Sequence, residues 1–387
     1  MDWFLVCSEC ARERDAAGLP SVCECGRPWL VRYRGRTRGR APGSGLSRAH
    51  GLWRYATFLP VSTDEEPVSL GEGGTPLLAV PRLGGHLGFS RLFVKDEGTN
   101  PTGSFKARGI AVAVTRARLA GAGAFTLPTA GNAGVAAAAY GARAGIPVRA
   151  YAPRSTPATI LSQIAAYGGE LMLIDGHIGD CGKASRAWAA ESGAFDLSTL
   201  REPYRIEGKK TMGLELSEQL EWTLPDAILY PTGGGTGLIG MWKAFQELVE
   251  AGWVSGPLPR MYTVQAEGCA PVVRGFERNA DGCDPWPDPQ TVASGLRVPA
   301  PLGDRLMLRA LRESGGGAVA VSDGDLVAAA EQGSRLEGID LCPEGGAAIA
   351  AARLLLERGV LNADERVVLF NTGAGWLYRE PAQLLRS

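Results

Sequence analysis

Short apolar segments alternate with helical patterns along most of this chain, and no other feature constrains its fold as strongly. Strands are expected at 91–94, 124–127, 148–151, 171–174, 228–230, 262–264 and 367–370. Helices are expected at 105–119, 132–144, 157–166, 183–191, 238–250, 325–337 and 347–357. Strands that alternate with helices form parallel sheets covered on both faces. The pattern therefore predicts an α/β fold, in which ligands bind at the carboxyl ends of the strands.

Length and charge limit the classes of function. The chain has 387 residues, and a domain usually takes about 100–200, so two domains and a small appendage are expected. Its 40 basic and 41 acidic residues give a net charge of −1, which argues against a general nucleic-acid binder. No run of about 18 apolar residues predicts a membrane span, and no signal peptide is evident at the start. We expect a cytoplasmic protein that binds neither nucleic acid nor membrane.

Four of the eight cysteines lie within the first 25 residues, at Cys7, Cys10, Cys23 and Cys25. Thiolates at these spacings can converge tetrahedrally on zinc, and four ligands leave no open position, so a structural site is predicted. The alternative is four unrelated buried thiols. Arginines follow at positions 32, 34, 36, 38 and 40. A solvated basic linker is the favoured interpretation of this run, and a nucleic-acid-binding arm is the alternative.

Lysine is scarce, with six in the chain, and Lys106 lies where a strand is followed by a helix, in the segment Asn100–Gly109. A helix N-terminus disfavours a cation, so the pKa of a lysine there is expected to fall. A lysine that is more often neutral is a better nucleophile towards an aldehyde. The alternative is an ordinary surface lysine.

Two further strand-to-helix junctions carry polar groups suited to a ligand. Thr129–Gly134 places a Gly-Asn pair, Gly131 and Asn132, at the start of a helix, where free backbone N–H groups can bind a carboxylate or a phosphate. Thr372 follows the strand at 367–370, and its hydroxyl could form a hydrogen bond with a ring nitrogen. Taken alone, the first is more simply interpreted as an ordinary N-cap, and the second is equally compatible with a capped turn.

A glycine-rich loop, Pro231–Gly240, follows a strand and opens a helix. Such a loop can cradle a phosphate with its backbone N–H groups and the helix dipole. Gly235, Gly237 and Gly240 also spell G-x-G-x-x-G, so a nicotinamide oxidoreductase is an alternative. That fold needs an acid at the end of the next strand, and the match is weak. A lysine, a phosphate cradle, an amide and a hydroxyl together suit pyridoxal phosphate.

The chain resembles the threonine synthase family, which belongs to the fold type II (tryptophan-synthase-β-like) pyridoxal-phosphate enzymes. The resemblance extends from Gly71 to Tyr378. Its motifs are 71–77, 100–109, 128–132, 202–213, 231–240, 265–271, 342–347 and 371–375. The cysteine-rich start is similar to the zinc ribbon of some bacterial and archaeal members. The resemblance implies two open α/β domains with the cofactor in the cleft, plus this small four-cysteine unit.

The resemblance also implies a role for each matching residue. Lys106 would hold the cofactor and shuttle protons, Asn132 would bind the ring oxygen, and Thr372 would contact the pyridine nitrogen. The cofactor phosphate would be cradled by Gly233, Gly234, Gly235, Thr236 and Gly237. The substrate carboxylate would lie at Thr129, Ala130, Gly131 and Asn132. The substrate phosphate would face Arg205 with Ser198 or Thr199. The domains implied are 1–45, the large cofactor-binding domain 46–111 with 205–387, and the small domain 112–204.

The implied reaction converts O-phospho-L-homoserine and water to L-threonine and phosphate, in a homodimer. Three departures from the usual motifs, Ala107, Ala133 and Trp376, put the substrate rather than the cofactor in question. The alternatives are a threonine or serine deaminase, an enzyme that replaces the β-phosphate of phosphoserine as cysteate synthase does, and a non-catalytic relative that uses its cysteine-rich head for binding.

Overall fold

The computed structural model describes residues 3–35 and 41–379, which form two compact units. The first unit comprises residues 1–74 and 100–211, and the second comprises residues 75–99 and 212–387. Of the arginine run expected to be a linker, positions 36, 38 and 40 lie outside the described residues. No helix among the described residues is long and apolar enough to cross a membrane.

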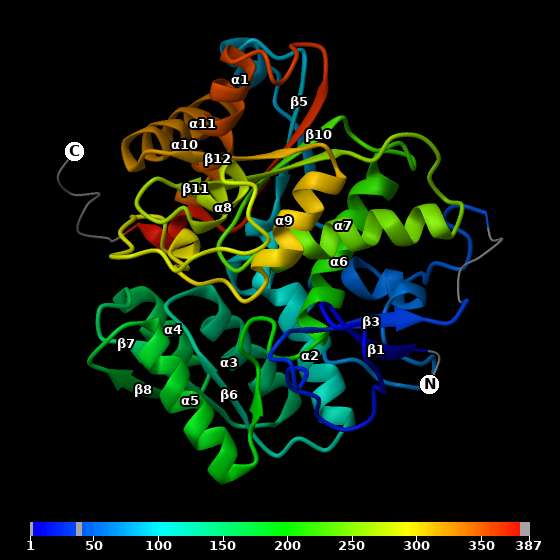
Figure 1. Cartoon of the computed structure of the whole chain (residues 1–387), viewed down its shortest axis with the longest axis vertical. Coiled ribbons are helices and arrows are strands. Elements are labelled where there is room, and N and C mark those ends of the chain that lie inside the picture. Colours follow the sequence, from blue (N-terminus) through cyan, green and yellow to red (C-terminus); the bar gives the residue numbers. More distant parts are fainter. Residues whose placement is uncertain (1–2, 36–40, 380–387) are drawn as a thin grey trace. The chain divides into compact units, whose positions relative to one another are not determined.

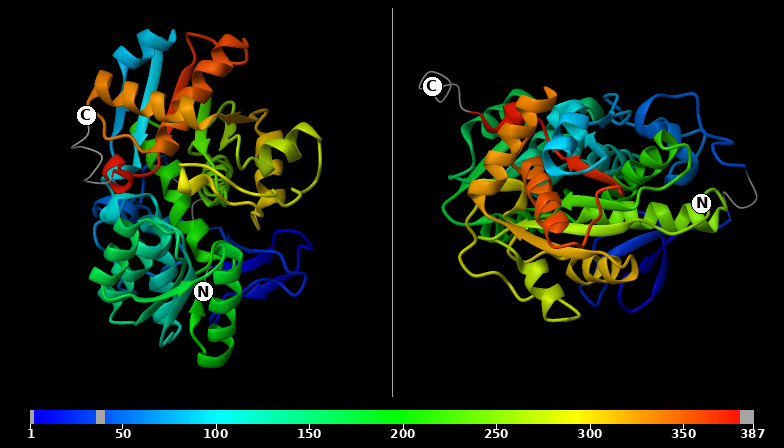
Figure 2. Two further views of the ribbon diagram at one scale, coloured as in Figure 1. Left: turned by 90° about the vertical axis from the view of Figure 1, so that its left-hand side faces the viewer. Right: turned by 90° about the horizontal axis from the view of Figure 1, so that it is seen from above.

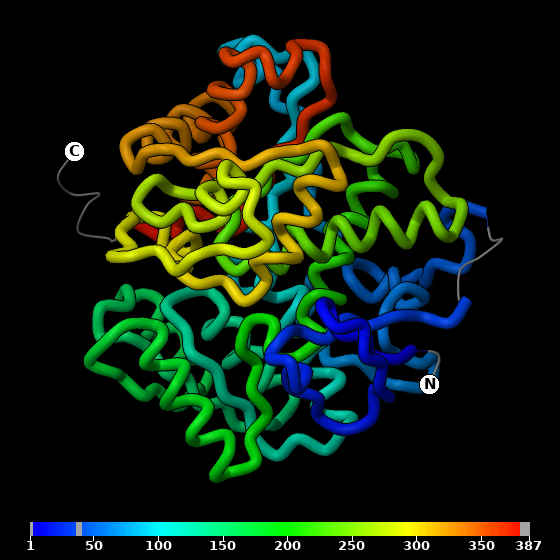
Figure 3. Tube along the Cα trace, viewed as in Figure 1, coloured from blue at the N-terminus to red at the C-terminus, as the bar shows by residue number. Residues whose placement is uncertain are grey.

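The first unit begins with a small antiparallel sheet of order β2-β1-β3 (blue in Figure 3). Its strands are β1 (Trp3–Cys7), β2 (Glu13–Asp15) and β3 (Trp29–Tyr33). Alternate residues of β1, namely Trp3, Leu5 and Cys7, are buried, which is the period-two pattern of a strand with one covered face. The cysteines lie in β1 and in the turns beside it, so the sheet supports the four-cysteine cluster.

The rest of the first unit is an α/β layer around a parallel sheet of order β8-β7-β6-β9 (Figure 1). The strands are β6 (Phe125–Pro128), β7 (Val148–Pro153), β8 (Glu170–Ile174) and β9 (Phe195–Asp196). The helices are α2 (Lys106–Leu119), α3 (Asn132–Ala144), α4 (Ala158–Ala166), α5 (Ile178–Ser192) and the first half of α6 (Tyr204–Gln219). Short 3₁₀ helices cover Gly51–Phe58 and Pro101–Gly103.

The second unit is built on a six-stranded sheet of order β12-β11-β10-β13-β5-β4, in which only the edge strand β4 is antiparallel. The strands are β4 (Leu77–Ala79), β5 (Arg91–Asp96), β10 (Ala227–Pro231), β11 (Arg260–Ala266), β12 (Gly317–Val321) and β13 (Arg366–Asn371). The helices are α1 (Pro81–Leu87), α7 (Thr236–Glu250), α8 (Pro271–Glu277), α9 (Asp304–Glu313), α10 (Asp323–Glu337) and α11 (Pro343–Glu357), with 3₁₀ helices at Glu97–Thr99, Ser294–Leu296 and Gly375–Tyr378. Helices α10 and α11 lie side by side (orange in Figure 2).

Every predicted strand and helix is present, and the parallel α/β class is confirmed. Helix α6 was not predicted, because its residues from Tyr204 to Ser217 are all buried and the helix shows no amphipathic stripe. The N-terminal sheet, the short strands β4, β9 and β12, and helices α1, α8 and α9 were not predicted either. Helix α5 begins at Ile178, five residues before the expected start.

The compact units divide the chain at places other than the predicted domain boundaries. Residues 46–74 and 100–111, assigned from the sequence to the large domain, belong to the same unit as the sheet of the small domain. The reason lies in the packing of α2 against α3 and α6. A Cβ atom at Gly109 would lie 2.8 Å from the Arg205 carbonyl oxygen, and one at Gly208 would lie 2.0 Å from that of Arg108. These two glycines let the N-terminal turns of α2 and α6 approach closely.

Candidate active site

Both units place the predicted site residues at the carboxyl ends of parallel strands. In the first unit, β6 and β9 are neighbours, and residues 129–134 and 197–205 follow them. In the second unit, β10 and β13 are neighbours, and the glycine loop and Thr372 follow them. This is the edge at which α/β sheets bind ligands. Each unit therefore brings its own part of the predicted set together.

Lys106 is the first residue of α2 and is half-buried. The chain reaches it through a tight turn in which Thr102 and Gly103 have φ angles of 63° and 69°. Asn100 fixes this turn, because its side-chain oxygen accepts a hydrogen bond from the Gly73 N–H at 2.9 Å. The helix start has no side-chain cap. The amine of Lys106 thus sits at the positive end of a helix, as predicted.

Lys209 was not among the site residues predicted from the sequence. Its side chain is 0% exposed, and its Nζ donates a hydrogen bond to the carbonyl oxygen of Phe105. The Nζ atoms of Lys209 and Lys106 lie 3.9 Å and 4.2 Å from the centroid of the Phe105 ring. Two of the six lysines therefore flank one aromatic ring at the start of α2. The rarity of lysine in the chain was the one signal that could have drawn attention to Lys209.

The segment Thr129–Gly134 forms the loop that opens α3. The Thr129 hydroxyl accepts hydrogen bonds from the N–H groups of Gly131 and Gly134 at 3.2 and 3.0 Å and donates to the Gly131 carbonyl at 2.8 Å. Gly134 cannot carry a side chain, because a Cβ there would lie 2.4 Å from the Thr129 methyl carbon. Thr129 therefore shapes the loop with its hydroxyl, and the backbone is the part of this segment that is suited to a carboxylate.

Arg205 lies in the first turn of α6 and is 1% exposed. Its Nη1 donates to the Leu197 carbonyl at 2.7 Å and to the Thr199 hydroxyl at 3.3 Å. Its buried Nε has no hydrogen-bond partner among the described residues. The Ser198 hydroxyl donates to Asp196 instead. Of the two upstream hydroxyls, that of Thr199 is the one hydrogen-bonded to Arg205. A buried guanidinium with an unpaired donor is suited to binding an anion.

Glu202 caps the helix that carries Arg205. Its carboxylate accepts hydrogen bonds from the N–H groups of Tyr204 and Arg205 at 2.7 and 3.1 Å. Burial raises the pKa of Glu202 to about 7, even though the charge of Arg205 and these two N–H donors favour the ionised form. The position of Arg205 is therefore set by a carboxylate that titrates near neutral pH.

The glycine loop of the second unit leads into α7, whose N-terminus has no side-chain cap. The N–H groups of Gly233, Gly234 and Gly235 have no acceptor within the described chain. A Cβ at Gly233 would lie 2.2 Å from the Gly295 carbonyl oxygen, and one at Gly235, with a φ of 78°, would lie 2.1 Å from the Met307 sulfur. Unpaired backbone donors at a helix N-terminus are a ready site for a phosphate.

Thr372 follows β13 and is 6% exposed, and its hydroxyl forms no hydrogen bond to any described residue. The residue before it is fixed, since the Asn371 amide donates to Asp96 at 2.8 Å and accepts from the Cys342 N–H at 3.1 Å. A nearly buried hydroxyl on a fixed strand end is suited to a polar ring atom. The amine of Lys106, the glycine loop and Thr372 are the groups that pyridoxal phosphate needs, so the residues fit this cofactor.

The four N-terminal cysteines gather into one cluster, with all four sulfur atoms within 4.8 Å of one another. Cys7 lies 3.4 Å from Cys25, and Cys10 lies 3.7 Å from Cys23, sulfur to sulfur. Burial opposes ionisation of Cys7, but hydrogen bonds from the N–H groups of Glu9 and Cys10 lower its pKa to about 7. Hydrogen bonding to the sulfur of Cys7 raises the pKa of Cys25 to about 12, so the four thiols do not ionise alike. Four convergent sulfur atoms nevertheless fit a tetrahedral zinc ion, which binds thiolates.

The N-terminal sheet is joined to α6 through buried charges. The Tyr33 hydroxyl at the end of β3 donates to Glu207 at 2.5 Å, and Lys210 pairs with Glu207 at 2.6 Å. Both charged side chains are fully buried. Tyr204 also donates to the Ala16 carbonyl at 3.1 Å. The N-terminal four-cysteine unit thus supports the helix that carries Arg205 and Lys209.

Comparisons with known proteins agree with this chemistry. A model of the pyridoxal-phosphate-dependent enzyme family matches residues 68–373. The chain is 39% identical to the threonine synthase of Methanosarcina acetivorans over 323 residues, which is 83% of this chain and 79% of the relative. It is 35% identical to that of Methanocaldococcus jannaschii over 384 residues, which is 98% of this chain and 94% of the relative. The threonine synthase of Mycobacterium tuberculosis is 36% identical over 83% of this chain and 86% of its own length.

Solved structures of an amino-acid racemase and an amino-acid deaminase share the fold. Maize serine racemase aligns with a TM-score of 0.70 and 22% identity, covering 81% of this chain and 90% of that protein. The processed form of threonine deaminase isoform 2 from Solanum lycopersicum aligns with a TM-score of 0.69 and 21% identity, covering 81% of this chain and 86% of that protein. The fold type II architecture expected from the sequence is therefore confirmed.

Proposed function

Because this chain belongs to the threonine synthase family of pyridoxal-phosphate-dependent enzymes, we propose that it converts O-phospho-L-homoserine and water to L-threonine and phosphate. The observation that carries the proposal is the identity of 35% to the Methanocaldococcus jannaschii threonine synthase over 98% of this chain. Arg205 supports a phosphorylated substrate, since it offers a buried cation with an unpaired Nε donor.

We assign the cofactor to residues of both units. Lys106 would hold pyridoxal phosphate covalently, and Asn132 would bind the ring oxygen. The backbone of Gly233, Gly234, Gly235, Thr236 and Gly237 would bind its phosphate, and the Thr372 hydroxyl would bind the ring nitrogen. The bound cofactor supplies an electron-withdrawing ring that stabilises negative charge at the substrate α-carbon. A hydroxyl partner leaves the ring nitrogen largely unprotonated.

We assign the substrate to the first unit. The backbone of Thr129, Ala130, Gly131 and Asn132 at the start of α3 would bind the carboxylate. Arg205, with Thr199 bound to it and Ser198 beside it, would bind the phosphate. In the course of the reaction the α- and β-carbons each lose a proton, and phosphate leaves the γ-carbon. The γ-carbon is then protonated, the hydroxyl of water adds to the β-carbon, and the α-carbon regains a proton. Lys106 is the group we expect to move these protons.

We propose that Cys7, Cys10, Cys23 and Cys25 bind one structural zinc ion, because their sulfur atoms converge. We also propose a cytoplasmic homodimer that binds neither nucleic acid nor membrane, in keeping with a net charge of −1 and with the family.

To test the proposal, purified, cofactor-loaded protein is given O-phospho-L-homoserine, and both products are measured. Threonine and inorganic phosphate are expected in equal amounts. If the yellow protein releases neither, the assigned substrate is wrong. O-Phosphoserine, threonine and serine are then the compounds to try, since a deaminase or a β-replacement enzyme would act on them.

A further inference from the structure

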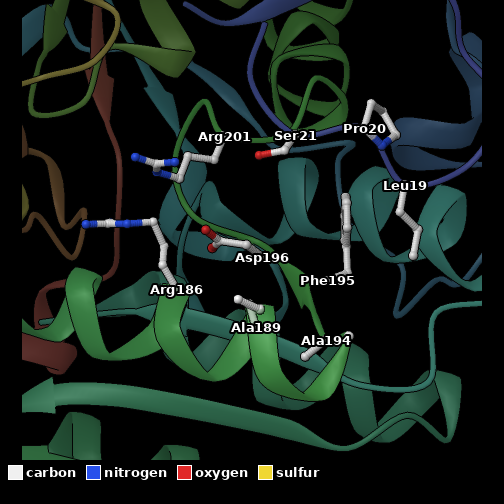
Figure 4. A pocket seen from close by; sticks show the side chains of 11 residues that line it. Leu19, Pro20, Ser21, Arg186, Ala189, Ala194, Phe195, Asp196 and Arg201 are labelled. Atoms are coloured by element: carbon white, nitrogen blue, oxygen red, sulfur yellow. The ribbon is translucent and has the colours of Figure 1, made fainter. Parts of the chain in front are cut away.

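A pocket in the first unit is lined by none of the residues assigned to cofactor or substrate. Its volume is about 330 Å³, within the range of about 300–1,000 Å³ of small-molecule sites. Residues 19–21, from the loop before Cys23, form one wall, and α5 and the segment from β9 to Arg201 form the others (Figure 4). The pocket therefore lies between the N-terminal cysteine-rich segment and the α/β layer, both of which belong to the first compact unit.

One end of the pocket is basic. Arg186, from α5, and Arg201 extend their guanidinium groups towards this end (Figure 4). Neither guanidinium group forms a hydrogen bond or an ion pair within the described residues. Burial, followed by the charge of Arg201, lowers the pKa of Arg186, and the charge of Asp196 acts in the opposite direction. Two neighbouring guanidinium groups with no hydrogen-bonded partner suit the carboxylate of a ligand.

A carboxylate lies at the same end. Asp196 uses Oδ1 to accept hydrogen bonds from the backbone N–H and the hydroxyl of Ser198. Its Oδ2 accepts no hydrogen bond from a described residue, and Figure 4 shows the carboxyl group directed towards the two guanidinium groups. No ion pair within 4.0 Å joins it to either arginine. Asp196 can therefore receive a cationic group of the ligand that binds the arginines.

The other end of the pocket is apolar. Leu19 and Pro20 lie on the side of the Phe195 ring away from the arginines (Figure 4), and Ala194 also lines the pocket. Leu19 remains 36% exposed, so this end has apolar surface that a ligand could cover. Burying a small aliphatic group there removes apolar surface from water, which is favourable.

We propose that this pocket binds a free α-amino acid with an apolar side chain. The arginine pair binds its carboxylate, Asp196 binds its ammonium group, and the side chain lies against Phe195, Leu19 and Pro20. The inference goes beyond the proposed function, because none of these residues has a role in it. The occupant is an effector: Leu197 and Thr199, which hold Arg205, lie in the chain between the pocket residues Asp196 and Arg201.

Calorimetry on the full-length holoenzyme tests the site. The cofactor is first fixed to its lysine with borohydride, so that an added amine cannot react with it. The probes are L-leucine, 4-methylpentanoate, which lacks only the ammonium group, and isoamylamine, which lacks only the carboxylate. We expect L-leucine to bind at least about tenfold more tightly than either analogue, since each lacks a charge-assisted contact. Absence of binding at millimolar L-leucine, or equal binding of 4-methylpentanoate, would overturn the proposal.

Three variants locate the binding. Arg186→Gln is expected to weaken L-leucine binding at least about tenfold. Asp196→Asn is expected to weaken the binding of L-leucine but not that of 4-methylpentanoate, and the amide oxygen of the variant can still accept a hydrogen bond from Ser198. Lys183→Gln is the control, since Lys183 is an exposed cation on the same helix. If the Arg186 and Asp196 variants bind L-leucine as the wild type does, the amino acid is bound elsewhere and the assignment is wrong.

Kinetics test the effector role separately. Saturating L-leucine is expected to change KM for O-phospho-L-homoserine at least about twofold in the untreated wild type and not in Arg186→Gln. An unchanged KM would overturn the effector role. Binding is measured without turnover, so a failure of the threonine synthase assignment is distinguishable from a failure of this one.

Discussion

Arg205 is held by Leu197: its Nη1 donates to the Leu197 carbonyl oxygen at 2.7 Å, while its Nε is buried without a partner among the described residues. The guanidinium is thus fixed by one nitrogen and retains a donor on another. A group that is both positioned and incompletely satisfied is suited to a ligand that brings its own acceptors.

Replacing Arg205 with lysine keeps the charge but removes the planar set of donors. We expect KM for O-phospho-L-homoserine to rise by at least about tenfold, the loss of one charge-assisted hydrogen bond. The cofactor absorbance should be unchanged, because no cofactor contact is assigned to Arg205. Steady-state kinetics measure this, with Arg154→Lys, an exposed surface arginine, as the control. An unchanged KM would remove Arg205 from the substrate site.

The pKa of Glu202 gives a pH-dependent prediction. Burial raises it to about 7 in the folded protein, above the value of about 4.3 in an unfolded chain. The folded state therefore holds the proton more tightly, and the contribution of Glu202 to stability falls as pH rises from about 4 to about 7. The glutamine side chain in Glu202→Gln cannot ionise. The free energy of unfolding of this variant should therefore rise relative to that of the wild type as pH rises over this range.

The size of that gain is on the order of 3 kcal/mol between about pH 5 and about pH 8. Urea unfolding of both proteins at the two pH values measures it. A difference in free energy of unfolding that is the same at both pH values would show that Glu202 does not titrate near neutrality.

Metal removal tests the four-cysteine cluster. We expect one zinc ion per chain by elemental analysis, and its removal by a chelator should lower Tm by at least about 5 °C, since structural zinc contributes folding energy. Cys10→Ser should lose the metal and have the same low Tm. Cys283→Ser, a half-buried cysteine of the second unit, is the control. A purified wild type with no metal and a Tm indifferent to the chelator would contradict the assignment.

A buried ion pair stabilises the second unit. Lys95 Nζ lies 2.5 Å from Glu215, and the two side chains are 0% and 4% exposed. Glu215→Ala leaves the lysine charge buried without this partner, so we expect a loss of about 3–5 kcal/mol in the free energy of unfolding. Glu331→Ala, which breaks the exposed pair with Arg335, should cost less than about 1 kcal/mol. Equal losses in urea unfolding would contradict this account.

The strands and helices predicted from the sequence are those with local signals. The Ala-rich helix α3 and the apolar strand β10 could be recognised because composition and length identify them. Helix α6 could not, because burial from Tyr204 to Ser217 leaves no periodic pattern to detect. The site residues could be named from motifs, but which hydroxyl faces Arg205 depends on the fold. Ser198 is held by Asp196, so Thr199 takes the place beside Arg205.

Lys209 shows a different limit. Nothing in the local sequence separates it from Lys210, yet the two adjacent side chains have different roles. Lys209 reaches the Phe105 carbonyl beside Lys106, whereas Lys210 pairs with Glu207 near the N-terminal sheet. The direction of each side chain is decided by the close crossing of α2 and α6, two helices that lie far apart in the sequence.

We expect Lys106 to carry the cofactor, and the experiment must distinguish it from the neighbouring Lys209. Borohydride reduction of the holoenzyme, proteolysis and mass spectrometry locate the pyridoxyl group. The account predicts modification of Lys106 alone among the six lysines, and loss of the cofactor absorbance in Lys106→Ala. A pyridoxyl group on Lys209, or an unchanged absorbance in Lys106→Ala, would contradict it.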